Sequence, residues 1–175
     1  SGGDIFNTVT NKYWDGEEGV VVIPVYYQLK LLEFIPREQG GGFVGELSAS
    51  SEEVRSAERD QGTGMEMLKS GNELVRTAQH YVKIVHDDGT LESAIVDMKK
   101  TQLKKSRLWN SLMTMQKHNG ATLPSYACMY RMKSVEDGND KGSWNTWSIA
   151  HEGMVPSVEA YTDCKDLHSN ISSGA

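Results

Sequence analysis

The sequence has little cysteine and little proline, and it has no long apolar run. Its two cysteines, Cys128 and Cys164, do not belong to a C-x-x-C pair, which excludes zinc-ribbon and thioredoxin-like motifs. We expect both to be buried, reduced thiols rather than a disulfide. That expectation indicates a reducing compartment such as a cytoplasm.

The chain also lacks a membrane-spanning segment and an excess of positive charge. Its longest apolar run, 20–23, continues past Pro24 only to Tyr27, whereas roughly 20 residues are needed to span a bilayer. The formal net charge is -6, which argues against binding nucleic acid over the whole surface. A local basic stripe is still compatible with such binding, because charges beyond about 8–10 Å are screened at physiological salt.

Five segments predict strands. Residues 19–34, GVVVIPVYYQLKLLEF, are rich in β-branched and aromatic residues. Residues 73–86 and 91–98 flank a turn whose Asp88-Gly89 step indicates a hairpin, and residues 126–135 and 144–151 flank the polar loop EDGNDKGS. Pro24 predicts an edge or a bulge in the first strand, because proline cannot donate to a ladder.

A helix is predicted between the third and fourth strands. Thr101 can cap it, and it runs to about Lys117. Leu108, Leu112 and Met115, flanked by Trp109 and Met113, form one broad apolar face. A weaker helix is predicted over 156–167.

The segment 36–72 is rich in Gly, Ser and Glu and has weak periodicity. A connection of this length is unusual in a compact domain, and we expect it to be mobile without ligand. A short helix around 51–59 is indicated by SSEE, which can supply its cap. Since 175 residues suit one domain better than two, we expect a single domain over 1–175 with a long insertion or flexible loop at about 36–72.

The order of these elements predicts a mainly β fold with α-helices. Five strands with a helix between the third and fourth, followed by a C-terminal helix, is typical of the OB-fold. The OB-fold is a partly open five-stranded barrel that binds oligonucleotides and oligosaccharides.

The acidic chain gathers positive charge at the start of the predicted central helix. Five of the first ten residues of MKKTQLKKSRLWNSLMTM, at 98–115, are Lys or Arg. Helix N-termini favour negative side chains, so this placement is easier to explain if a phosphate binds there. The alternative is a solvated helix start whose Lys stems cover apolar surface.

The same stretch, with DGNDKGSWNTWSI and GVVVIPVYYQLKLLEF, resembles a group of tailed-bacteriophage proteins assigned as single-stranded-DNA-binding proteins. The resemblance covers about 19–35 and 80–165. It implies an OB-like barrel and a role in phage replication or recombination, in the cytoplasm of the infected bacterial host. It does not assign DNA contacts residue by residue.

The candidate DNA contacts therefore come from strand periodicity and from flat rings beside positive charge. Arg131 and Lys133 lie on the wet face of their strand. Trp144 and Trp147 have opposite parity, so we expect Trp144 to be an exposed stacking ring and Trp147 to be core; the alternative is that a bulge places both in the core. The predicted nucleic-acid-binding residues are Tyr26, Lys30, Lys99, Lys100, Lys104, Lys105, Arg107, Arg131, Lys133, Lys141 and Trp144.

No catalytic or metal motif accompanies these residues. The loop EDGNDKGS does not have the spacing of a calcium loop, and neither G-x-S-x-G nor H-E-x-x-H occurs. We predict no catalytic residue, no metal and no cofactor, and a protein that is not an enzyme.

Two functions of different classes remain. The first is sequence-independent binding of single-stranded DNA through a basic groove and base stacking, with phage replication proteins or a second copy of the chain as further candidate partners. The second is a non-catalytic structural or protein-interaction module of a phage virion or replication complex. An arrangement of the cations on one face with an exposed aromatic ring would favour the first.

Overall fold

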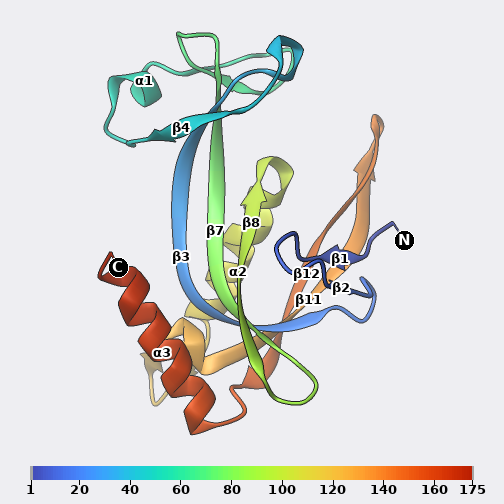
Figure 1. The fold of residues 1–175 in the computed structure, drawn as a ribbon, viewed down its shortest axis with the longest axis vertical. Coiled ribbons are helices and arrows are strands. Elements are labelled where there is room, and N and C mark those ends of the chain that lie inside the picture. Colours follow the sequence, from blue (N-terminus) through green and yellow to red (C-terminus); the bar gives the residue numbers. More distant parts are fainter. Residues whose placement is uncertain (1, 175) are drawn as a thin grey trace. The chain divides into compact units, whose positions relative to one another are not determined.

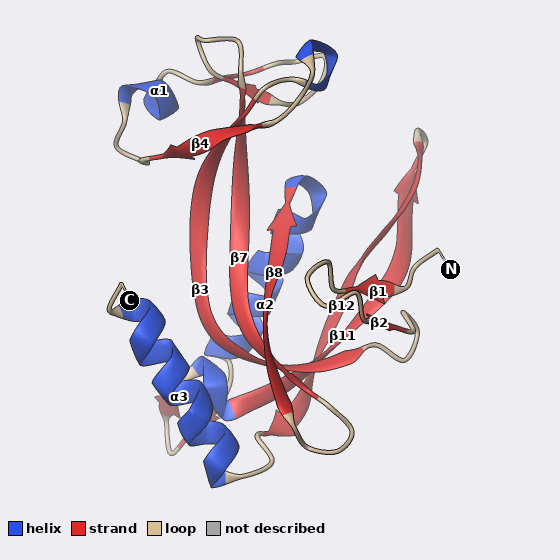
Figure 2. Cartoon of the chain, viewed as in Figure 1, coloured by secondary structure: helices blue, strands red, loops and turns tan. Residues whose placement is uncertain are grey.

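The computed structural model describes residues 2–174, and strands make up most of its regular structure (Figure 1, Figure 2). The fold is mainly β, with three α-helices in the described residues. The long strands are β3 (Val20–Phe34), β7 (Glu73–Val85), β8 (Leu91–Lys99), β11 (Cys128–Asn139) and β12 (Gly142–Met154). The short strands are β1 (Ile5–Phe6), β2 (Tyr13–Trp14), β4 (Phe43–Leu47), β5 (Glu58–Arg59), β6 (Glu66–Met67), β9 (Lys117–His118) and β10 (Ala121–Thr122). The helices are α1 (Glu52–Arg55), α2 (Leu103–Thr114) and α3 (Val158–Ser172), with 3-10 turns η1 (Arg37–Gln39), η2 (Lys100–Gln102) and η3 (Ser125–Ala127).

All five predicted strands and both long predicted helices are confirmed as elements, with shifted ends. The largest difference is at the second hairpin, where strand pairing continues through the segment predicted as the loop EDGNDKGS. β11 reaches Asn139 and β12 begins at Gly142, so the prediction of an eight-residue polar loop at EDGNDKGS is wrong, and only two residues form the turn. Polar side chains suit this extension because β11 pairs with β3 only at 130–132, and beyond that point the hairpin is a two-stranded ribbon (Figure 1).

The largest sheet has the strand order β12-β11-β3-β7-β6-β5, with β4 also paired to β3 and β8 to β7. β11 pairs antiparallel with β3 at Val20–Val22, and β4 pairs with its other end at 31–34. Pro24 lies two residues beyond Val22, the last residue of β3 that pairs with β11, so its missing N–H does not interrupt that ladder. β1 with β2 and β9 with β10 form separate two-stranded sheets.

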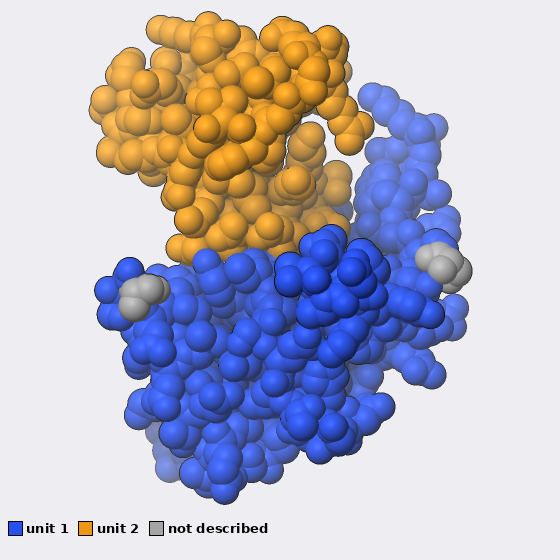
Figure 3. Space-filling model, viewed as in Figure 1, with its two compact units in different colours: residues 1–27, 80–96, 104–175 blue, residues 28–79, 97–103 orange. Residues whose placement is uncertain are grey.

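The chain forms two compact units (Figure 3). Unit 1 comprises residues 1–27, 80–96 and 104–175, and unit 2 comprises residues 28–79 and 97–103. Each unit has its own apolar cluster. The cluster of unit 1 is centred on Ile23, Val25 and Cys164, and the cluster of unit 2 on Leu31, Leu68 and Leu74.

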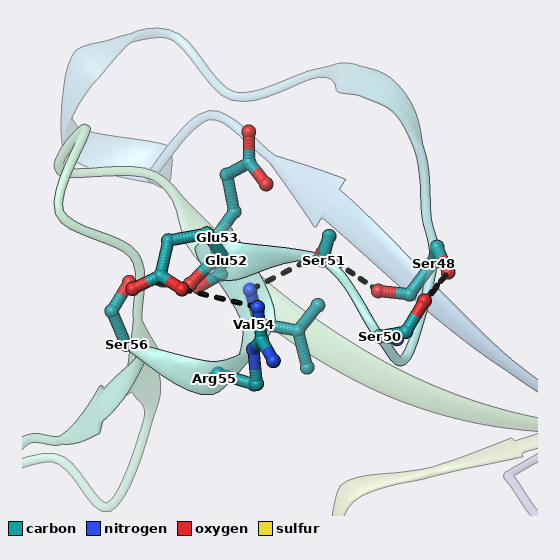
Figure 4. Close-up of polar contacts among 8 residues, drawn as sticks. All are labelled: Ser48, Ser50, Ser51, Glu52, Glu53, Val54, Arg55 and Ser56. Atoms are coloured by element: carbon teal, nitrogen blue, oxygen red, sulfur yellow. Dashed lines mark hydrogen bonds and ion pairs between the residues drawn. The ribbon is translucent and has the colours of Figure 1, made fainter.

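Unit 2 contains the whole segment 36–72, which holds η1, β4, α1, β5 and β6. The SSEE sequence caps α1 as predicted: the Ser51 hydroxyl accepts a hydrogen bond from the Val54 backbone N–H at 3.4 Å, and Glu52 pairs with Arg55 at 3.3 Å (Figure 4). Val54 also packs against the apolar cluster of unit 2, which ties the helix to its surroundings. The mobility of this segment stays a prediction.

Both cysteines are buried and free, as expected. Burial raises the pKa of the Cys164 thiol to about 11 and also raises the pKa of Cys128, so neither is a reactive thiolate at neutral pH. Within residues 2–174, no helix is long and apolar enough to cross a membrane.

Candidate nucleic-acid interface

The predicted binding residues divide between the two units. Unit 2 holds Lys30, Lys99 and Lys100. Unit 1 holds Tyr26, Lys104, Lys105, Arg107, Arg131, Lys133, Lys141 and Trp144.

The start of α2 is built differently from the prediction. Thr101 does not cap the helix, because a 3-10 turn, η2, precedes it and has no side-chain cap at its own start. Lys100 has φ 55°, a left-handed conformation that costs a non-glycine residue of order 1 kcal/mol. The first turn of α2 contains no acidic residue, so its positive side chains face no compensating charge within the helix itself.

The buried face of α2 includes Trp109, as predicted, but not Leu108. Its buried residues are Ser106 and Trp109, whereas Leu108 is 51% exposed and Leu112 half-buried. The predicted face was drawn from apolar residues alone, and a buried serine with a polar partner could not be recognised that way.

Four of the predicted cations have carboxylate partners. In unit 1, Lys104 lies 4.0 Å from Asp137, and Arg131 donates two bonds to Glu152 Oε1 at 3.0 and 3.1 Å. A third donor of Arg131 bonds the Glu18 carbonyl at 2.9 Å, which leaves little of this guanidinium for a phosphate. In unit 2 the pairs are Lys30 with Glu46 at 3.0 Å and Lys100 with Glu73 at 3.3 Å.

The remaining predicted cations form no ion pair with a carboxylate within residues 2–174. They are Lys105, Arg107, Lys133 and Lys141 in unit 1 and Lys99 in unit 2. Surface ion pairs contribute about 0–1 kcal/mol each, so the paired cations could exchange a carboxylate for a phosphate at modest cost. The unpaired cations could bind a phosphate without breaking an ion pair.

The two faces of β11 are those expected from its sequence. Cys128, Tyr130 and Met132 are buried, whereas Arg131 is half-buried and Lys133 exposed. Burial on one face and charge on the other is the pattern of a strand with a core side and a wet side.

Neither tryptophan of the hairpin has the environment that was predicted. Trp144 is half-buried rather than exposed, and Trp147 is half-buried rather than core. The ladder pairs Trp144 with Asp137, so Trp144 lies on the β11 face that carries Lys133, and Lys104 reaches the same carboxylate from α2. The start of α2 and the Trp144 side of the ribbon therefore meet at Asp137.

Tyr26 is not an open stacking ring. It is half-buried in unit 1 and lies 6.2 Å from Tyr81 and 5.5 Å from His168, measured between ring centroids. A base could stack on Tyr26 only after these neighbours moved.

A family model for the Pam3 phage gp34-like protein matches residues 1–175. The chain belongs to this Pam3 phage gp34-like family, and it is therefore a phage protein. No curated protein and no solved structure matches it.

The gp34-like chain also has a buried polar contact that the sequence did not reveal. His80 Nε2 and Ser106 Oγ lie 2.7 Å apart, and the His80 ring stacks on Trp109 at 4.5 Å. His80 and Ser106 are each 1% exposed, and burial lowers the pKa of His80 to about 4. A Ser–His contact is the geometry of a nucleophile and its base, but a sealed hydroxyl cannot reach a substrate, so this contact serves packing.

A shallow groove in unit 1 of this gp34-like protein has a volume of about 650 Å³. Glu92 in its wall accepts from His86 at 2.9 Å and lies 3.6 Å from Lys12, and Asp87 and Asp88 also line it. The acidic lining makes it a poor site for a phosphate. No cluster of three or more potential metal ligands occurs in residues 2–174.

Proposed function

We propose that this protein binds single-stranded DNA without sequence preference, as a non-enzymatic component of phage replication or recombination in the host cytoplasm. The observation that carries the proposal is the meeting of a basic helix start with an aromatic side chain. α2 contains Lys104, Lys105 and Arg107 and no acidic residue, and Lys104 reaches Asp137, the ladder partner of Trp144. Positive charge beside a flat ring is what a single-strand site requires.

The strand arrangement gives a second line of support. In the order β12-β11-β3-β7-β8, the first long strand lies between the second and the fourth, and α2 comes between the third and fourth along the chain. We propose that this is an OB-like barrel left open, since β8 and β12 are not neighbours in the described sheet. OB-folds bind oligonucleotides on partly open barrels of this kind.

The distribution of charge explains how an acidic protein could serve this function. Carboxylates already occupy Lys30, Lys100, Lys104 and Arg131, and a phosphate backbone would compete with them. Binding should then be weak at high salt and non-specific in sequence, since phosphate contacts carry no base information.

The test is a fluorescence-anisotropy titration with labelled oligo-dT, the matching duplex and the matching RNA. A Lys105→Glu/Arg107→Glu variant should bind oligo-dT less tightly, and its plot of log affinity against log salt should be flatter by about 1.4, at about 0.7 per lost phosphate contact. Lys69→Glu/Lys165→Glu is the matched control, because both of these exposed lysines lie outside the predicted set. Equal effects of the two double variants would remove α2 from the interface.

A specific observation favours the alternative function as a non-catalytic interaction module. The β1–β2 hairpin exposes Phe6 (55%), Val9 (87%) and Tyr13 (71%) in a segment that also carries Asp15, Glu17 and Glu18. An apolar patch beside acidic residues suits a protein partner better than a phosphate backbone. Oligo-dT affinity that is absent even at low salt, with partner capture lost in Phe6→Ala/Tyr13→Ala, would favour this alternative.

A further inference from the structure

We propose that Phe43, together with Phe34 and Lys99, forms a base-stacking site for single-stranded nucleic acid on unit 2. This inference rests on the proposed function and adds a site that the sequence pattern did not indicate. All three residues belong to unit 2, so the site does not depend on how the units are placed.

The ring of Phe43 is presented rather than buried. Phe43 is 61% exposed, and its ring lies 5.6 Å from that of Phe34, its ladder partner on β3. The ladder pairs Glu33 with Gly45 and Phe34 with Phe43, so Val44 is an extra, bulged residue. A bulge breaks the alternation of faces, and here it leaves two consecutive apolar side chains exposed, since Val44 is 50% exposed.

The backbone on both sides of Phe43 contains three glycines with open space around them. A Cβ added at Gly41, Gly42 or Gly45 would meet no atom within 4 Å. Gly41 and Gly42 have positive φ values of 69° and 122°, which explain their identity, but Gly45 lies in a strand with neither a positive φ nor a close neighbour. A glycine in a strand often marks a bulge, a bend or a place where a ligand or another backbone approaches closely. The bulge at Val44 lies directly beside Gly45, and the open space above Gly45 leaves room for a ligand.

The charge beside the ring selects the occupant. Lys99 Nζ lies 5.8 Å from the centroid of Phe34 and is exposed. It forms no ion pair among the described residues, although the carboxylate of Asp97, two residues earlier on β8, is near enough to interact with its charge. Glu33, the acidic residue of β3, accepts a hydrogen bond from the side-chain amide of Asn72 at 2.6 Å. An unpaired base stacked on Phe43 would place its phosphate within reach of Lys99. A purely apolar partner would offer no negative group to the Lys99 ammonium.

A pair of substitutions at Phe43 separates stacking from simple apolar contact. In the full chain, Phe43→Leu keeps an apolar side chain without a π face and should weaken oligo-dT binding at least about fivefold. Phe43→Trp should retain affinity within about twofold, and oligo-dT should quench more tryptophan fluorescence than in wild type. Lys99→Gln should flatten the salt slope by about 0.7.

Val44→Ser is the matched control, because it removes an apolar neighbour of similar exposure and should leave affinity unchanged. Wild-type affinity in Phe43→Leu, or equal losses in Phe43→Leu and Val44→Ser, would overturn the stacking site while leaving the proposed function standing. A change in self-association at constant DNA affinity, measured by sedimentation, would instead assign this edge to a second copy. Absence of wild-type binding at low salt would overturn the proposed function itself.

Discussion

Each of the two compact units contains a pair of neighbouring rings, and the two pairs have opposite surroundings. In unit 1, His80 stacks on Trp109 at 4.5 Å, and both are at most 1% exposed. In unit 2, the rings of Phe34 and Phe43 lie 5.6 Å apart, Phe43 is 61% exposed, and the ammonium of Lys99 lies over the Phe34 ring. Desolvation keeps the histidine of the first pair neutral, whereas the lysine beside the second pair is exposed to water.

This difference indicates which ring pair contributes to the stability of the fold and which is free to bind a ligand. A sealed ring pair contributes apolar burial and cannot meet a ligand, whereas an open pair contributes little to folding and keeps a π surface free. Substitutions in the two pairs should therefore separate the free energy of unfolding from the affinity for nucleic acid.

The largest effect is expected at Trp109. Trp109→Ala should lower the free energy of unfolding by about 3–5 kcal/mol, because it leaves a cavity beneath His80 and Tyr130. Chemical denaturation measures the loss. If this variant does not fold, the same measurement on Trp109→Phe tests the prediction. We expect Trp109→Phe to cost only about 1 kcal/mol, because the loss of packing is partly offset by the removal of a buried indole N–H that has no partner. A cost below 1 kcal/mol for Trp109→Ala would show that the stack is not part of the core.

The next effect is the dependence of stability on pH. His80 has a pKa of about 4 in the folded protein against 6.5 when unfolded, so between these values the unfolded chain binds the additional proton. Stability is therefore complete above pH 6.5 and falls as the pH approaches 4, by about 3 kcal/mol in total. Denaturation at several pH values should show this fall. The double variant His80→Leu/Ser106→Ala removes both members of the hydrogen bond and should flatten the curve, and an unchanged curve would contradict the assignment to His80.

The two tryptophans of the ribbon should give intermediate and contrasting effects. Trp144→Ala should weaken oligo-dT binding by about 1–3 kcal/mol, because Trp144 lies opposite Asp137 beside the basic start of α2. Trp147→Ala should lower the free energy of unfolding by about 1–3 kcal/mol, less than a fully buried ring would, and should leave affinity unchanged. Anisotropy and denaturation on both variants measure the contrast, and a reversed pattern would exchange the two roles.

The smallest effect on folding is expected at the exposed pair. Phe43→Ala should change the free energy of unfolding by no more than about 0.5 kcal/mol, as for most surface substitutions. Denaturation curves for this variant and for Trp109→Ala complete the comparison. A cost above 2 kcal/mol would mean that Phe43 is a packing residue, and its exposure would then need another explanation.

The sequence predicted the elements of the fold better than their surroundings. Periodicity located the five long strands and two long helices, because alternation and helical spacing are local signals. The cap of α1 at Ser51 was also local and is confirmed. The predicted start of α2 at Thr101 was wrong, because Lys100 adopts a left-handed conformation that its residue type does not favour.

Side-chain environments depended on contacts distant in sequence and were predicted less well. Tyr26 was expected to face a base, but it packs with Tyr81 and His168. The burial of His80 against Ser106 required α2 to meet β7, and the exposure of Phe43 required a bulge. Composition and period do not encode either event, so the sequence offered no signal for these two sites.

The salt dependence of wild-type binding to oligo-dT tests the central claim most directly. Anisotropy titrations at several salt concentrations give the slope of log affinity against log salt. With three to five phosphates contacted by the unpaired cations, we expect a slope of about -2 to -3.5, at about 0.7 per phosphate. A slope near zero, or no binding at low salt, would contradict the account of this phage protein as a single-stranded-DNA binder.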